Sequence, residues 1–267
     1  MLLSFLPVVF CLLAYCLGVF FLWQNSRNAN NNKYAIGAIL VAVILHSLIL
    51  YRSIVGDGDV VVTLGTGISV AGWVSVLIYL LASSRYPLMS TGLVIIPIAA
   101  IAVLAGALLP GEPISLNALP SEIIWHVVLA VPAYGFLCLA FAQACLLIVL
   151  EKQLRNPSSP KLLNSLPAIQ TMEYSLFMFT LLGFTFMTIN LLMGMTSSMM
   201  NQGNLLAFNH HIILSLIAWI AFGCLLIGRR YAGWRGETAA KWTISAFSIF
   251  LLAYFGTRFV NDIILGN

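Results

Sequence analysis

The chain has 267 residues, of which 61% are hydrophobic and only 7% are charged. Its mean hydropathy is +1.01, so it has too little polar surface to cover a water-soluble globule. The composition therefore predicts a polytopic membrane protein whose main partner is the lipid bilayer. The net charge of +4 does not indicate nucleic-acid binding, because the basic residues lie in short loops and form no basic domain.

Several apolar segments are long enough to cross a bilayer, which requires about 20 mainly apolar residues in a helix. Single spans can satisfy their backbone in lipid only as helices, so we expect an all-α fold, a bundle of about eight transmembrane helices. We expect residues 1–267 to form a single integral membrane domain. The predicted spans are residues 3–23, 35–53, 61–83, 89–109, 123–150, 172–196, 208–228 and 242–263.

The loops between these spans differ in charge from one side of the membrane to the other. The acidic residues Asp57, Asp59, Glu112 and Glu122 belong to one side. Loops on the other side hold ten of the twelve basic residues: Arg27, Lys33, Arg85, Lys152, Arg155, Lys161, Arg229, Arg230, Arg235 and Lys241. Because basic loops remain in the cytoplasm, we expect both termini on the periplasmic side of a bacterial inner membrane.

All four histidines fall toward the expected outer side of the bundle. His46 lies just beyond the middle of the second span, and His126 lies near the outer end of the fifth. His210 and His211 open the seventh span, and at most one of them can face a given metal, since neighbouring helical residues point about 100° apart. Neutral imidazole is a good axial ligand for haem iron. We therefore expect a haem b site, with His126 and His46 as iron ligands.

Nearby residues could hold the rest of such a cofactor. Glu122 precedes His126 by four residues, so it lies on the same helix face and could orient the imidazole. His211 shares a face with Ser215, Ala218 and Phe222. The outer side also carries the aromatic residues Trp73, Trp125, Phe208 and Trp219. These could contact a flat apolar macrocycle, or they could form an aromatic belt at the membrane surface.

Other chemistries lack their sequence signals. No C-x-x-C-H motif is present, which excludes covalent c-type haem attachment to this chain. The chain also has no G-x-S-x-G, H-E-x-x-H or P-loop motif, so we expect no enzyme activity. A methionine-rich segment, M-G-M-T-S-S-M-M at residues 193–200, could bind Cu(I) through its thioethers, although such clusters at a membrane edge also serve in packing.

Three stretches resemble one protein family. They are W-H-V-V-L-A-V-P-A-Y-G-F-L-C-L-A (125–140), L-S-L-I-A-W (214–219), and G-W-R-G-E-T-A-A-K-W (233–242) followed by A-Y-F-G-T-R-F-V (253–260). Together they resemble the cytochrome c assembly family that includes CcsA, CcmC and HemX, with the best match over residues 125–260. The resemblance implies haem carriage at the outer membrane face, with other cytochrome c maturation proteins as partners, and His126 matches the first external histidine of the family.

The chain also departs from the family pattern. The tryptophan-rich external loop is replaced by L-A-F-N-H-H-I at residues 206–212. Two further family histidines correspond to Ile227 and Ile264. The sequence therefore predicts an inner-membrane haem-binding protein that assists cytochrome c assembly or related haem metabolism. Two alternatives stay open, a haem-free membrane scaffold or accessory subunit, and a small-solute or copper permease.

Overall fold

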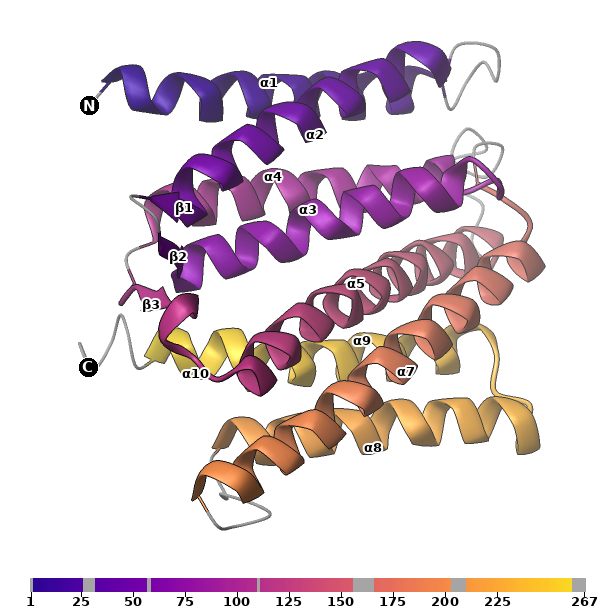
Figure 1. Ribbon diagram of the computed structural model, residues 1–267. Coiled ribbons are helices and arrows are strands. Elements are labelled where there is room, and N and C mark those ends of the chain that lie inside the picture. The colour runs from indigo at the N-terminus through magenta and orange to yellow at the C-terminus, as the bar shows by residue number, and fades with distance from the viewer. Residues whose placement is uncertain are drawn as a thin grey trace.

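The protein is a bundle of long helices, as the sequence predicts (Figure 1). The computed structural model describes residues 2–25, 32–56, 59–109, 111–155, 166–202 and 210–260. Within these residues, eight helices are long and apolar enough to cross a membrane. The helices are α1 (Leu2–Asn25), α2 (Asn32–Ile54), α3 (Leu64–Ser83), α4 (Gly92–Leu108), α5 (Ser121–Arg155), α7 (Ile169–Gln202), α8 (His210–Tyr231) and α9 (Gly236–Leu251).

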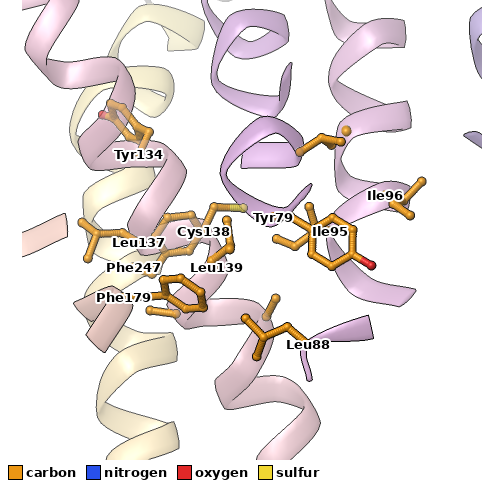
Figure 2. Close-up of a cluster of buried hydrophobic side chains, with 14 of the residues drawn as sticks. Tyr79, Leu88, Ile95, Ile96, Tyr134, Leu137, Cys138, Leu139, Phe179 and Phe247 are labelled. Carbon is orange, nitrogen blue, oxygen red and sulfur yellow. The ribbon is translucent and has the colours of Figure 1, made fainter. Parts of the chain in front are cut away.

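Helix α5 lies at the centre of the bundle. It packs against α3 on one side and against α7 and α9 on the other. The α1–α2 pair lies at one margin beside α3 and α4, and α8 lies at the opposite margin beside α9 and α7 (Figure 1). Figure 2 shows the apolar core around α5, where Leu137 and Cys138 lie close to Phe247 of α9. The central position of α5 explains why its side chains are mostly buried while those of α1 and α8 largely face outward.

Small residues allow α3 and α4 to approach closely. An ideal Cβ added to Gly65 would lie 2.7 Å from the carbonyl oxygen of Ala105, and one added to Gly72 would lie 2.5 Å from Cβ of Ala102. Neither position has room for a larger side chain. Glycine at a helix interface lets the two backbones come together, which is a common means of helix association in membranes.

A small antiparallel sheet covers one end of the bundle and was not predicted. It consists of β1 (Val55–Gly56), β2 (Asp59–Val62) and β3 (Ile114–Ser115), in the order β1-β2-β3. Oδ1 of Asp59 accepts hydrogen bonds from the Ser115 hydroxyl and the Val60 amide, both at 2.8 Å. The expected start of the third span at residue 61 is therefore wrong. Thr63 instead caps α3, because its side chain accepts a hydrogen bond from the Thr66 amide at 3.2 Å.

The last span also begins at a different place from the predicted one. Helix α9 starts at Gly236 rather than at residue 242, so the chain turns from α8 into α9 within a few residues. After Leu251 the helix continues as a π-helical turn, Leu252–Gly256, and a final helical turn α10, Thr257–Phe259. Polar residues at 237, 238 and 241 concealed this start in the sequence, because a hydropathy window favours the more apolar part of a helix.

Candidate functional site

His126 lies in the second turn of α5 and is held in place by α7. Its Nδ1 atom is 3.1 Å from the main-chain carbonyl oxygen of Asn190. A carbonyl oxygen can only accept a hydrogen bond, so Nδ1 must carry the proton and donate it. The neutral ring therefore has its lone pair on Nε2. This is the tautomer that a metal-binding histidine adopts when its second nitrogen is fixed by a carbonyl group.

Gly194 of α7 leaves room for the His126 ring. An ideal Cβ at this position would lie 3.1 Å from Cε1 and 3.3 Å from Nδ1 of His126. Because Gly194 follows Asn190 by four residues, both positions lie on the same face of α7. That face thus supplies a hydrogen-bond acceptor and, one turn later, the space for the imidazole.

His211, in the first turn of α8, lies near His126. The two side chains are within range of direct electrostatic interaction. The face that His211 shares with Ala218 and Phe222 points into the bundle, since both of those residues are fully buried. The structure therefore places His126 and His211 at the same end of the bundle, which we call the histidine end.

Asn190 presents a second oxygen near this pair. Its side-chain atom Oδ1 is buried and has no hydrogen-bond partner among the described residues. Buried amide oxygens are normally hydrogen-bonded. A donor from a bound molecule would satisfy this oxygen. No sequence pattern singles out Asn190 or Gly194, because their role depends on how α7 packs against α5.

The remaining residues expected at the histidine end are arranged differently. Trp125 is 59% exposed and faces away from the core. Glu122 is half-buried, and the hydrogen bond of His126 goes to Asn190 rather than to this carboxylate. Phe208 and the side chain of His210 lie outside the described residues.

The other expected aromatic residues serve helix packing. The indole of Trp219 donates a hydrogen bond to the Thr188 hydroxyl at 2.9 Å and stacks on Phe184 with ring centroids 5.6 Å apart. The indole of Trp73 donates to the Ser47 hydroxyl at 3.0 Å. These contacts link α8 to α7 and α3 to α2, respectively.

His46 lies on α2 and takes part in a separate polar cluster. It is fully buried, and both of its ring nitrogens are hydrogen-bonded. Nδ1 is 3.0 Å from the Tyr15 hydroxyl on α1, and Nε2 is 2.9 Å from the Ser69 hydroxyl on α3. His46 therefore joins three helices in the first half of the chain, and neither nitrogen is available to a metal without breaking one of these bonds.

We predict that His46→Leu lowers stability without lowering the haem content of the folded protein. The substitution leaves two buried hydroxyls without this partner and should reduce the free energy of unfolding by about 2 to 4 kcal/mol. Thermal unfolding in detergent measures this change, with the neighbouring exposed Leu48→Ala as the control. A variant of normal stability that had lost bound haem would instead make His46 an iron ligand.

The opposite end of the bundle contains the G-W-R-G-E-T-A-A-K-W segment. The buried carboxylate of Glu173, on α7, accepts a hydrogen bond from the Gly236 amide at 2.7 Å. Arg229 of α8 lies 3.9 Å from the other oxygen of Glu173, and its guanidinium is 4.6 Å from the centre of the Phe177 ring. Trp234 and Trp242 stack with ring centroids 5.1 Å apart. We call this the α8–α9 end.

Glu173 fixes the start of α9 through its hydrogen bond with the Gly236 amide. A carboxylate near a helix N-terminus is stabilised by the free amides there. The signal in the sequence was the single acidic residue within an apolar segment, which is costly in a membrane and therefore usually has a partner.

The fold and the site define a multi-pass helical membrane protein with a histidine pair at one end of its bundle and a charged cluster at the other. The family model described as "Cytochrome C assembly protein" matches residues 3–265. The chain therefore belongs to the cytochrome c assembly protein family.

Relatives of this family extend over most of the chain. The inner membrane protein YpjD of Escherichia coli strain K12 is 27% identical over 249 residues, which is 90% of each chain. Protein HemX of Brevibacillus brevis is 24% identical over 250 residues, or 91% of each chain. An uncharacterized 28.8 kDa protein of Azospirillum brasilense is 29% identical over 148 residues, 54% of each chain. No solved structure gives a significant match.

Proposed function

We propose that this protein binds b-type haem at the histidine end and assists cytochrome c assembly or related haem metabolism. His126 is the principal axial ligand in this proposal. The observation that carries it is the hydrogen bond from Nδ1 of His126 to the Asn190 carbonyl at 3.1 Å, which puts the lone pair of the neutral ring on Nε2, the atom that would bind iron. Membership of the cytochrome c assembly protein family supports the same reading.

The residues at the histidine end fit a haem better than a bare metal ion. A bare ion needs several protein ligands, and the described residues contain no group of three or more His, Cys, Asp or Glu that could hold one. Haem iron is already held by its porphyrin and needs only one or two axial ligands. His126 would supply the first and His211 the second. When bound, the haem would supply a reducible iron. The Asn190 carbonyl would fix the orientation of the His126 imidazole that binds this iron.

The location and partners follow from the same proposal. The relative YpjD is named an inner membrane protein, and the concentration of basic residues at the α8–α9 end supports a cytoplasmic position for that end. The histidine end and both termini would then face the periplasm. Haem would be passed to or received from other maturation proteins there, with no covalent chemistry performed by this chain.

An absorption spectrum of the detergent-purified protein tests the proposal. We expect a b-type spectrum after dithionite reduction, with close to one haem per chain by the pyridine haemochrome assay. A colourless protein that also fails to take up added hemin would contradict the proposal. It would favour a haem-free scaffold that keeps the fold of the family.

A further inference from the structure

A polar cleft lies at the α8–α9 end, far along α5 from His126. Its volume is about 460 Å³, and it opens to the outside. The last turns of α5, the first turns of α7 and the start of α9 surround it. Its ionisable lining residues are Glu151, Arg155, Glu173, Arg235, Glu237 and Lys241.

The charges of this lining balance, since three residues are acidic and three are basic. Most of them are already paired. Glu237 lies 3.3 Å from Arg155 and 2.8 Å from Lys241, and Glu173 binds Arg229 and the start of α9 as described above. Glu151 and Arg235 take part in none of the ion pairs or hydrogen bonds found among the described residues. One carboxylate and one guanidinium therefore remain available in the same cleft.

The Glu151 carboxylate lies close against the first residue of α9. An ideal Cβ on Gly236 would overlap Oε1 of the Glu151 carboxylate. Because residue 236 is glycine, the carboxylate can rest directly against the first residue of α9. The available carboxylate therefore lines the cleft directly beside the start of α9.

This arrangement selects a ligand with two opposite charges. A simple anion could pair only with Arg235 and a simple cation only with Glu151, so either would leave one of the two available groups without a partner. We propose that the cleft binds an ammonium–phosphate group, with the ammonium at Glu151 and the phosphate at Arg235. Guanidinium groups suit phosphate oxygens, and a primary ammonium can donate hydrogen bonds to a carboxylate.

The location of the cleft points to the membrane as one source of this group. It lies at the ends of membrane-spanning helices, beside the Trp234–Trp242 stack. Indole rings concentrate at the boundary between lipid and water, where phospholipid headgroups lie. Phosphatidylethanolamine carries the required ammonium and phosphate, and free O-phosphoethanolamine carries the same pair of groups without lipid chains.

Native mass spectrometry of the full-length, delipidated protein tests this proposal. The protein is titrated with phosphatidylethanolamine, phosphatidylcholine or phosphatidylglycerol of identical acyl chains. Phosphatidylcholine has a quaternary ammonium that cannot donate a hydrogen bond, and phosphatidylglycerol has no ammonium. We expect phosphatidylethanolamine to bind about tenfold more tightly than either, which is the effect of one hydrogen bond to a charged group. Equal binding of the three lipids overturns the proposal.

Two substitutions locate the bound lipid. Glu151→Gln and Arg235→Gln should each abolish the preference for phosphatidylethanolamine. Arg230→Gln should retain it, since Arg230 is an exposed basic residue of the same end that does not line the cleft. Retention of the full preference in Glu151→Gln would overturn the assignment. The comparison of lipids on the unmodified protein needs no variant to fold.

A competition experiment then distinguishes a lipid headgroup from a soluble ligand as the source of the ammonium–phosphate group. Displacement of phosphatidylethanolamine by millimolar O-phosphoethanolamine would support the ammonium–phosphate site and identify a soluble ligand as able to fill it. Failure to displace the lipid, with the preference over phosphatidylcholine intact, would support the lipid headgroup as the occupant.

Discussion

His126→Ala is expected to lower the haem content of the purified protein by at least about tenfold. Loss of a group that merely orients a metal ligand costs about 10- to 100-fold in metal affinity, and loss of the ligand itself should cost no less. The pyridine haemochrome assay, expressed per mole of folded protein, measures the change. Val128→Ala is the matched control, because Val128 lies two residues further along α5 with an exposed side chain.

Added imidazole separates loss of the ligand from loss of the fold. In His126→Gly, the space of the missing ring remains beside Gly194. Free imidazole should enter this space and restore a b-type spectrum if His126 serves as an iron ligand. A His126→Ala protein that keeps full haem occupancy would remove the central claim of the proposed function.

Gly236→Ala is expected to reduce the free energy of unfolding by about 1 to 3 kcal/mol. The cost is conformational, because Gly236 has φ of 56°, and a non-glycine residue held in this region costs about 1 to 3 kcal/mol. The new Cβ would also overlap Oε1 of Glu151, but this atom is the end of a flexible side chain that can move away at little cost. Thermal or denaturant unfolding in detergent measures the change.

Gly233 provides a matched control in the same turn. Its φ is 66°, and a Cβ added there meets no atom within 4 Å. Gly233→Ala should therefore have a conformational cost of the same size, about 1 to 3 kcal/mol. The double variant Gly236→Ala with Glu151→Ala should show no recovery of stability beyond the sum of the two single variants. A much larger cost for Gly236→Ala than for Gly233→Ala would show that the Glu151 carboxylate cannot move away from residue 236.

Much of the fold could be predicted from the sequence, because long apolar runs report helices directly. A segment such as residues 89–109 needs no tertiary information to be recognised as a membrane span. The predicted helix boundaries were wrong where hydrogen bonds of polar residues determine the structure. The strands near Asp59 and the start of α9 at Gly236 are fixed by hydrogen bonds to Ser115 and Glu173. Both partners are more than 50 residues away in the chain.

The candidate site could also be predicted only in part from the sequence. The sequence selected His126 and His211 because ionisable residues are rare in apolar spans. It could not select Asn190, since a main-chain carbonyl has no signature in the amino-acid sequence. It also proposed His46 as an iron ligand on the same grounds as His126, although the structure surrounds the two histidines differently.

The sequence by itself determined the class of protein, the number of spans and the end of each span at which a histidine lies. These properties depend on composition and on position along one helix. Only the tertiary structure decided that Nδ1 of His126 donates to the Asn190 carbonyl, that both nitrogens of His46 bind Tyr15 and Ser69, and that Glu151 lies against Gly236. Such contacts join different helices, and they depend on how each helix is rotated and packed against its neighbours, which no single span specifies.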